Sequence, residues 1–494
     1  MSARTRPDRD PADAAGCPIH GRADRAVVLF APGTRRGSDA PVAKAPGAAA
    51  STGATGDVPQ GVAPFTPDDV QSNVIRSVNP AQAHYLFFRI TDAALARRLV
   101  GTLVDPPPAD PAAEGTLVAL PPDDRRFWSE AKAHRYDADG TRRVAGSSWN
   151  IAFTWTGLQA LGLDPNTLAS FPEDFRDGMA MRAERLGDVG SSAPEHWDGW
   201  LGSREVHGVL LVSLQAPPAG DDLPGRMEVG LARLAPGARL PSRSPVEDLV
   251  DDLAGSGLRI LHAEIGARIA SPLDPDHRIE HFGFRDGISQ PFVGADLGTP
   301  RPPPPGGGTA RPDGSWDPVA RGELLLGWPD EDGLVQARPA HPDLRLNGTY
   351  MVFRKLEQDV VGFRRYLAEH GGATGRESLL AAQMMGRWPD GTSLVASPDG
   401  PTQGGDDRTI NDFRYGAEDP RGLRCPVGAH VRRLNPRDSN NRDEARRHRI
   451  WRRSITYGDF LPYGAPGDGR SRGILFVALC ARIDQQFESV SYTH

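Results

Sequence analysis

A single carboxylate stands between two glycines in the segment HFGFRDGISQP at residues 281–291, where Asp286 lies between Gly283 and Gly287. A carboxylate that is held in place can accept a proton and return it, which is general acid–base chemistry. Glycine has no side chain, so the two glycines would let the backbone approach a flat ligand closely. Taken alone, the loop is equally compatible with an acid that caps a helix.

The segment 424–460 is rich in arginine. Nine arginines stand between Arg432 and Arg453, against three acidic residues, in a chain whose formal net charge is −7. Three interpretations fit this pattern: a solvated basic face, a contact surface for nucleic acid, and a pocket for a small polyanion such as a cofactor with carboxylates or phosphates. A solvated face is the usual case for an arginine run, and the segment contains no recognisable nucleic-acid reader motif.

His430 lies among small and apolar residues of the same segment, after CPVGA and before Val431. A lone histidine is more often a structural side chain than a metal ligand. A haem, however, requires one axial ligand, cationic groups for its two propionates and an apolar slot. His430 and the neighbouring arginines supply the first two of these. Asp286 and Arg452 could then serve the opposite face of the haem.

Short apolar strands mixed with amphipathic helices are expected to position these residues. Four segments are typical of strands: 84–91, 208–214, 349–356 and 473–483. Apolar residues recur at helical spacing in EQDVVGFRRYLAEHGG, at 357–372, which predicts a helix there. No glycine-rich nucleotide loop follows a strand, so an α+β protein with antiparallel sheets, built from two similar halves, is the better prediction.

The start and the middle of the chain differ in composition from these elements. The chain has 494 residues, among them 56 glycines and 46 prolines. Residues 1–65 are rich in Ala, Gly and Pro, and we expect them to form a disordered tail. The Pro/Gly-rich stretch 298–318 is expected to be a long surface loop. It would separate a domain at 66–297 from a domain at 319–494.

The composition also bears on partners and compartment. The three cysteines are widely spaced, which argues against a disulfide framework and favours a reducing compartment. No apolar run reaches the length of about 18 residues that a membrane span needs, and no signal peptide is recognisable. We therefore expect a cytoplasmic protein without membrane association. The negative charge argues weakly against nucleic acid as a partner, and a homo-oligomer is left open.

Three segments resemble those of dye-decolourising peroxidases. GFRDG at 283–287 matches the G-x-x-D-G signature of that family. CPVGAHVRRLNPR at 425–437 resembles its proximal-histidine segment, and RIWRRSITYG at 449–458 resembles its distal-arginine segment. The likeness continues through flanking segments in the same order, over residues 68–490. One short signature would be weak evidence, whereas three functional segments in order are strong.

The resemblance implies a fold and a set of site residues. The family fold is a pair of ferredoxin-like units with antiparallel sheets, of the dimeric α+β barrel type, with haem b in the second unit. His430 would be the proximal iron ligand, and Asp286 and Arg452 would lie together on the distal face. Arg437 is expected near a haem propionate, and Arg453 is a further candidate for cofactor binding.

The resemblance also implies a reaction. Hydrogen peroxide would oxidise the haem to a ferryl form, which then takes electrons from bulky dyes, phenols or other aromatic reductants. Asp286 would move the peroxide proton, and Arg452 would stabilise the charge that develops as the O–O bond breaks. Asp484 and Glu488 are candidates for a carboxylate that orients His430. Trp451 and Tyr457 could relay electrons, although packing is the more common role for an aromatic residue.

Two other functions stay open at this stage. The first is a haem-binding or haem-delivery protein with little turnover, because the chain ends at SVSYTH soon after QQFE, where family members usually continue. The second is a nucleic-acid binder that uses the arginine-rich segment. The first would bind haem without a response to peroxide, and the second would bind nucleic acid in a salt-dependent way.

Overall fold

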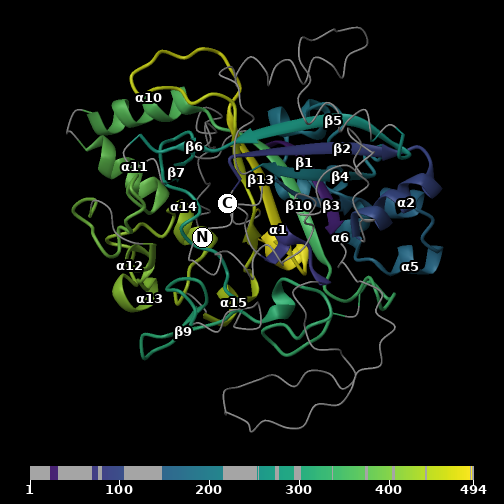
Figure 1. The fold of residues 1–494 in the computed structure, drawn as a ribbon. Coiled ribbons are helices and arrows are strands. Elements are labelled where there is room, and N and C mark those ends of the chain that lie inside the picture. Colours follow the sequence, from purple (N-terminus) through teal and green to yellow (C-terminus); the bar gives the residue numbers. More distant parts are fainter. Residues whose placement is uncertain are drawn as a thin grey trace, which may run out of the picture.

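A computed structural model describes the following residues: 23–31, 69–75, 80–104, 147–214, 253, 255–272, 277–293, 302–336, 338–372, 376–402, 407–439, 442–489 and 491. Figure 1 shows their arrangement around one large antiparallel sheet. Helices α10–α13 gather on one side of the view, and α2 and α5 lie on the other.

The N-terminal unit contributes four antiparallel strands to this sheet. They lie in the order β3-β4-β2-β5, and their bounds are β2 (Gln82–Ile90), β3 (Ser147–Phe153), β4 (Gly208–Leu214) and β5 (Leu258–Ala267). Helix α2 (Ala93–Val104) follows the first of them. A spatial order of second, third, first and fourth strand is that of a ferredoxin-like unit.

The C-terminal unit repeats this order, but its fourth strand comes from the start of the chain. The sheet runs β11-β13-β10-β1, with β12 also paired to β13. The bounds are β10 (Thr349–Glu357), β11 (Trp451–Arg452), β12 (Ile455–Tyr457), β13 (Gly473–Cys480) and β1 (Ala23–Ala31). β1 pairs antiparallel with β10 along nearly its whole length. Residues 1–65 are therefore not entirely a structureless tail, which corrects that expectation for 23–31.

The two edges of the sheet approach each other, so the sheet closes toward a barrel. The Thr456 hydroxyl of β12 donates a hydrogen bond to the Ala267 carbonyl at the end of β5. Phe87 of β2 and Phe353 of β10 meet inside, with ring centroids 5.0 Å apart. The outer face of the strands packs under helices, so several strands are apolar on both faces. This explains why β2, with the sequence QAHYLFFRI, is buried at nearly every position.

Short helices and small hairpins surround the sheet, most of them outside the barrel, whereas Val74 of the first helix packs with the side chains inside it. The first set of helices has the bounds α1 (Ser72–Ile75), α4 (Trp155–Ala160), α5 (Pro165–Ser170), α6 (Glu173–Asp177) and α7 (Ala183–Leu186). The second set has the bounds α10 (Val360–Gly371), α11 (Glu377–Met385), α12 (Asp407–Asn411), α13 (Tyr415–Glu418), α14 (His430–Leu434), α15 (Arg442–Arg447) and the π-helix η9 (Ile483–Glu488). The two-residue strands are β6 (Ile269–Ala270), β7 (Arg278–Ile279), β8 (Thr309–Ala310) and β9 (Trp316–Asp317).

These elements test the expectations drawn from the sequence. The four predicted strands are confirmed as β2, β4, β10 and β13, and the predicted helix is confirmed as α10, which Asp359 caps at Gly362 N. The antiparallel α+β fold is confirmed as well. The stretch 298–318 contains the β8–β9 hairpin and buries Trp316, so it is more than a surface loop. None of the helices in the described ranges is both long and apolar enough to cross a membrane.

Candidate active site

A cavity of about 1600 Å³ lies against the outer face of the C-terminal strands. Asp286, Arg452, His430 and Arg437 all line it, although up to 166 positions separate them in the sequence (from 286 to 452). Much of the remaining wall is apolar and includes the side chains Phe284, Met385, Leu434, Phe476 and Phe487. One cavity therefore combines a carboxylate, an imidazole, guanidinium groups and an apolar slot.

Asp286 is held in a tight hairpin that begins at β7. The Asp286 N–H donates to the Arg278 carbonyl (3.1 Å), and its Oδ1 accepts the Gly287 N–H (2.6 Å). Gly283 and Gly287 have φ of +100° and +81°, in the left-handed region that favours glycine. A Cβ added at Gly283 would lie 2.3 Å from the Tyr463 hydroxyl oxygen. The contacts thus assign the glycines to the turn and its packing, whereas the sequence suggested close approach to a cofactor.

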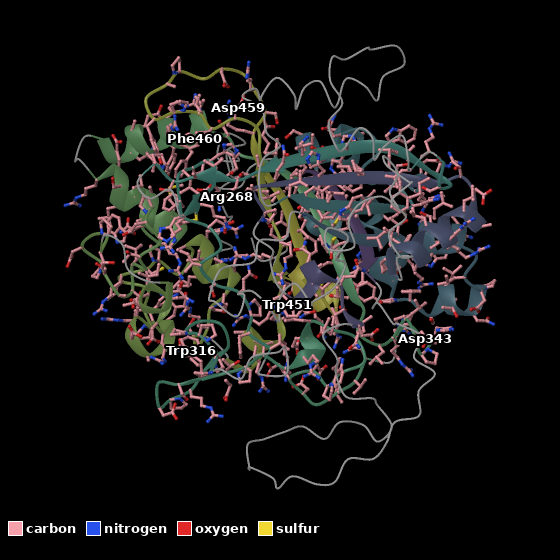
Figure 2. The ribbon with its side chains drawn as sticks, in the orientation of Figure 1. Arg268, Trp316, Asp343, Trp451, Asp459 and Phe460 are labelled. Carbon is pink, nitrogen blue, oxygen red and sulfur yellow. The ribbon has the colours of Figure 1, made fainter. Side chains whose placement is uncertain are left out.

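Arg452 is clamped to the end of the same segment. Its Nη1 lies 3.7 Å from Asp286 Oδ1, and its Nη2 donates to the Ser289 carbonyl (3.1 Å). Gln290 makes two reciprocal bonds to the backbone of Arg452, one accepted at 3.0 Å and one donated at 3.2 Å. The Trp451 indole donates to the Pro291 carbonyl (2.9 Å), and Figure 2 shows Trp451 near the centre of the molecule. The residues SQP after the signature therefore set the position of Arg452, a role that sequence reasoning missed.

The charges around Asp286 control its ionisation. Burial alone would raise the pKa of the Asp286 carboxyl, but the guanidinium groups of Arg452 and Arg278 outweigh it, and the net result is a lowered pKa. A lowered pKa means that the carboxylate, which is the proton-accepting form, persists into more acidic solution than for an ordinary Asp.

The Arg452→Leu variant should therefore lose activity at a higher pH than the wild type. The Arg452 guanidinium has the strongest effect that lowers the pKa of Asp286, so its removal should raise that pKa. The Asp286 carboxylate would then become protonated at a higher pH than in the wild type. The measurement is kcat/KM for hydrogen peroxide between pH 2 and pH 7. Arg365→Leu is the matched control, because Arg365 is an exposed arginine at the cavity wall. An unchanged acid limb in Arg452→Leu would contradict the pairing with Asp286.

His430 begins α14, and a buried ion pair holds the segment that leads to it. Arg432 Nη1 lies 3.1 Å from Asp419 Oδ2 and also donates to the Cys425 carbonyl (2.7 Å). Asp419 accepts the backbone N–H groups of Leu423 and Cys425. The loop before His430 is thus bound to the single carboxylate of Asp419, which fixes the position of His430 at the start of α14. No sequence motif marks Asp419, because its role depends on a turn of the folded chain rather than on its neighbours in the sequence.

Two further buried arginines, Arg437 and Arg449, form a cationic part of the cavity wall. Arg437 donates to the carbonyls of Asn411 and Phe413, and Arg449 donates to two glycine carbonyls in the segment before β8. Within the described ranges neither guanidinium forms an ion pair with a carboxylate. Burial lowers the pKa of Arg437 to about 9 and that of Arg449 to about 10. Two buried cations whose hydrogen-bond acceptors in the described ranges are neutral, with Glu331 and Asp438 acting on them only from beyond ion-pair distance, fit a ligand that carries carboxylates.

Arg453 is not brought to the cavity. Its Nη2 donates to the Val74 carbonyl (2.7 Å), and its Nε donates to the Asn73 carbonyl at the end of α1 (2.5 Å). Side chains alternate between the two faces of a strand, so Arg452 and Arg453 point in opposite directions. Arg453 therefore binds the carbonyl groups of α1 and is not carried forward as a cofactor-binding residue.

Asp484 and Glu488 also lie outside the cavity. Asp484 lines a separate, smaller pocket and donates its backbone N–H to Asp174 (2.9 Å). Glu488 forms ion pairs with Arg182 and Arg185. These contacts do not support either residue as the carboxylate that orients His430. Trp451 and Tyr457 are both buried and pack inside the barrel, in agreement with the packing role.

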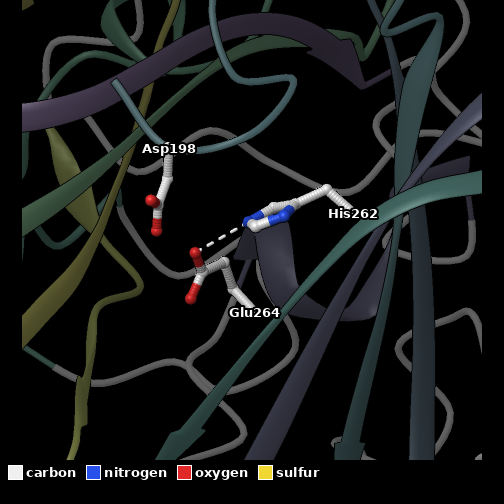
Figure 3. Close-up of side chains that lie close together, drawn as sticks. All are labelled: Asp198, His262 and Glu264. Carbon is white, nitrogen blue, oxygen red and sulfur yellow. Dashed lines mark hydrogen bonds and ion pairs between the residues drawn. The ribbon is translucent and has the colours of Figure 1, made fainter. Parts of the chain in front are cut away.

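Asp198, His262 and Glu264 lie together and have the residue types of a metal site (Figure 3). The Lys355 ammonium nitrogen, however, lies 2.8 Å from Glu264 Oε1 and 3.2 Å from Asp198 Oδ2. His262 Nε2 is 2.8 Å from the same Glu264 oxygen. Because a cation of the protein already sits between the two carboxylates, we assign this cluster to an ion-pair network rather than to a metal ion.

Comparison with known proteins places these residues in a family. A family model described as the DyP dimeric alpha+beta barrel domain matches residues 69–219, and one described as Dyp-type peroxidase, C-terminal, matches residues 330–494. The multifunctional dye peroxidase DyP2 of Amycolatopsis is 30% identical over 441 residues, which cover 85% of this chain and 79% of that protein. The chain belongs to the dye-decolourising peroxidase family.

Other relatives agree with this assignment. A dye-decolorizing peroxidase of Mycena epipterygia is 29% identical over 85% of this chain and 70% of its own length. The solved structure of an ancestral D-type dye decolorizing peroxidase superposes with a TM-score of 0.61 at 25% identity, over 87% of this chain and 84% of that one. This dye-decolourising peroxidase is thus an enzyme, and the alternative of a haem-delivery protein with little turnover is not favoured.

Proposed function

We propose that this enzyme binds one haem b in the cavity between His430 and the Asp286–Arg452 pair, and uses hydrogen peroxide to oxidise dyes, phenols or other aromatic reductants. The observation that carries the proposal is the cavity itself. It joins His430, Asp286 and Arg452 to an apolar wall and to buried arginines that have no carboxylate partner in the described part of the chain. These features match what a haem requires of its pocket.

Each residue has a distinct part in holding the cofactor. His430 is the proposed iron ligand, and Arg437 and Arg449 are the proposed partners of the propionates. The apolar side chains of the wall would exclude water from a haem bound in the cavity. When bound, the haem supplies an iron that coordinates peroxide and stores the two oxidising equivalents of the reaction.

Asp286 and Arg452 are the groups that act on peroxide. Oδ1 of Asp286 accepts the Gly287 N–H and lies nearer to Arg452, so we assign Oδ2 as the atom that takes the peroxide proton. It would then return this proton to the departing oxygen, which leaves as water. The Arg452 guanidinium would stabilise the negative charge that develops as the O–O bond breaks.

Aromatic reductants are suggested by a structural neighbour in the family. One solved dye-decolorizing peroxidase, 23% identical to this chain, is described in complex with 2,6-dimethoxyphenol. We propose small phenols and anthraquinone dyes as substrates of this enzyme too. The described cysteines, Cys425 and Cys480, are free thiols, which supports the proposed cytoplasmic location.

The absorption spectrum of the purified protein, before and after peroxide, tests the proposal. Reconstitution with haemin should produce a Soret band, and peroxide should change that band and start oxidation of an anthraquinone dye at acid pH. A haem-bound protein that shows neither response would contradict the enzymatic role and point to haem delivery. Salt-sensitive binding to DNA or RNA without a Soret band would instead support the nucleic-acid hypothesis.

A further inference from the structure

A buried carboxylate, Glu280, lies at the base of the hairpin that carries Asp286. It is 8% exposed and lines the same cavity as Asp286. It stands just before the G-x-x-D-G signature, and the sequence offered no reason to single it out. Its backbone closes the turn, since Glu280 N–H donates to the Phe284 carbonyl (3.0 Å) and the Glu280 carbonyl accepts the Gly283 N–H (2.9 Å).

The Glu280 side chain binds the remaining N–H groups of the turn. Its Oε2 accepts the Phe282 N–H (2.9 Å), and its Oε1 accepts the Phe284 N–H (2.8 Å). Buried backbone N–H groups need acceptors, and an unpaired one costs about 1–3 kcal/mol. Together with its own carbonyl, Glu280 thus accounts for every backbone N–H from 282 to 284. No other residue of this described hairpin accepts hydrogen bonds from three backbone N–H groups.

The position of the rest of the hairpin depends on the turn that Glu280 holds. Arg285 N–H donates to the Pro389 carbonyl and Asp286 N–H to the Arg278 carbonyl, so the chain reaches Asp286 directly from the turn that Glu280 closes. Gln358, which follows β10, donates its amide to Glu280 and links the turn to the sheet. The Glu280 carboxyl is therefore linked to Asp286 by a stretch of backbone, 282–286, in which every N–H group has an acceptor.

We propose that Glu280 is a positioning residue that holds the Asp286 hairpin in the geometry needed for proton transfer from peroxide. The inference rests on the proposed role of Asp286. Glu280 lines the cavity, but in this role it binds the backbone of the turn and takes no proton from peroxide. Its effect on the reaction passes through the backbone and through its charge.

The electrostatics of the hairpin support this division of roles. Burial raises the pKa of Glu280 to about 7, and the negative charge of Asp286 adds to the rise against its hydrogen bonds. The pKa of Asp286 is lowered instead. Tyr463, from the segment after β12, is a further titratable group near Glu280. The hydrogen bonds from Gln358, Phe282 and Phe284 lower the pKa of Glu280, because they stabilise its charged form.

The test compares Glu280→Gln with a matched control, Glu323→Gln. Glu323 is also buried, its pKa is also raised to about 7 by burial, and it also binds a backbone N–H and a glutamine amide. It does not line the cavity. In Glu280→Gln one carboxylate oxygen becomes an NH₂ group that faces a backbone N–H, so one bond of the turn is lost. Both variants should lower the Tm by similar amounts.

Only Glu280→Gln should affect the hairpin and the peroxide reaction. In the haem-free protein, amide hydrogen exchange in the peptide covering 281–287 should accelerate at least about tenfold, since a lost bond is worth about 1.4 kcal/mol or more. In the haem-loaded protein, the stopped-flow rate constant with peroxide should fall at least about tenfold, because a 1 Å misplacement can cost about 10²-fold. The KM for the dye and the haem content should not change.

Three outcomes would overturn the inference or separate it from the proposed function. If Glu280→Gln lowers the Tm as much as the control does but leaves the amide exchange rate and the peroxide rate constant unchanged, the role of Glu280 is purely structural. If Asp286→Asn also reacts at the wild-type rate, the proposed function of Asp286 fails instead. If Glu280→Gln does not fold, Gln358→Leu replaces it, because this variant removes the amide that binds Glu280. It should show the same faster amide exchange in the peptide covering 281–287 and the same slower reaction with peroxide. Wild-type values for both would refute the coupling.

Discussion

Asp286→Asn is expected to react with hydrogen peroxide about 10²–10⁴-fold more slowly than the wild type, which is the usual contribution of a positioned general acid–base. Asparagine has nearly the same shape and can keep the Gly287 N–H bond, but it cannot accept the proton. Its amide also removes the negative charge that lies 3.7 Å from Arg452 Nη1. The rate constant is measured by stopped-flow absorption in the absence of a reductant.

The control for this variant is Asp198→Asn. Asp198 is similarly exposed, at 38% of its side chain against 33% for Asp286, and it also pairs with a cation of the protein, Lys355. It lies outside the cavity lining, so its variant should react with peroxide at the wild-type rate. Haem content should be the same in both variants. A wild-type peroxide rate in Asp286→Asn would exclude Asp286 as the proton acceptor.

His430→Ala is expected to lose axial ligation of the haem, and with it most of the retained cofactor. The imidazole is the proposed bond to iron, and the short α14 helix offers no replacement at that position. The measurement is the Soret spectrum and the haem content after gel filtration. Added imidazole should restore part of the ligated spectrum, because it can enter the space that the side chain leaves.

His448→Ala tests the rival histidine of the same cavity. His448 also lines the wall, and its Nδ1 contacts the Ser489 hydroxyl (3.0 Å) and the Gln485 carbonyl of η9, so Nε2 is the ring nitrogen that could reach a ligand. We expect His448→Ala to retain haem with an unchanged Soret band. If His448→Ala loses the cofactor and His430→Ala keeps it, the ligand assignment is reversed.

Family features that are local in the chain could be predicted from the amino-acid sequence. Apolar runs such as 208–214 and 349–356 form strands because their side chains suit a sheet that is buried on both faces. The signature around Asp286 and the segments around His430 and Arg452 pointed to one haem site, since each combines residue types that this chemistry requires. Their convergence on one cavity agrees with that prediction, and their roles await the experiments above.

The neighbours that hold these residues in place became visible only in the folded chain. Adjacent residues in a strand face opposite sides, so Arg452 reaches the cavity while Arg453 binds the α1 carbonyls. Glu280, Gln290 and Asp419 are ordinary polar residues in the sequence, and they matter because folding buries backbone groups that then need partners. Strand β1 completes the C-terminal sheet by pairing across more than 300 positions, a non-local contact that no local pattern encodes.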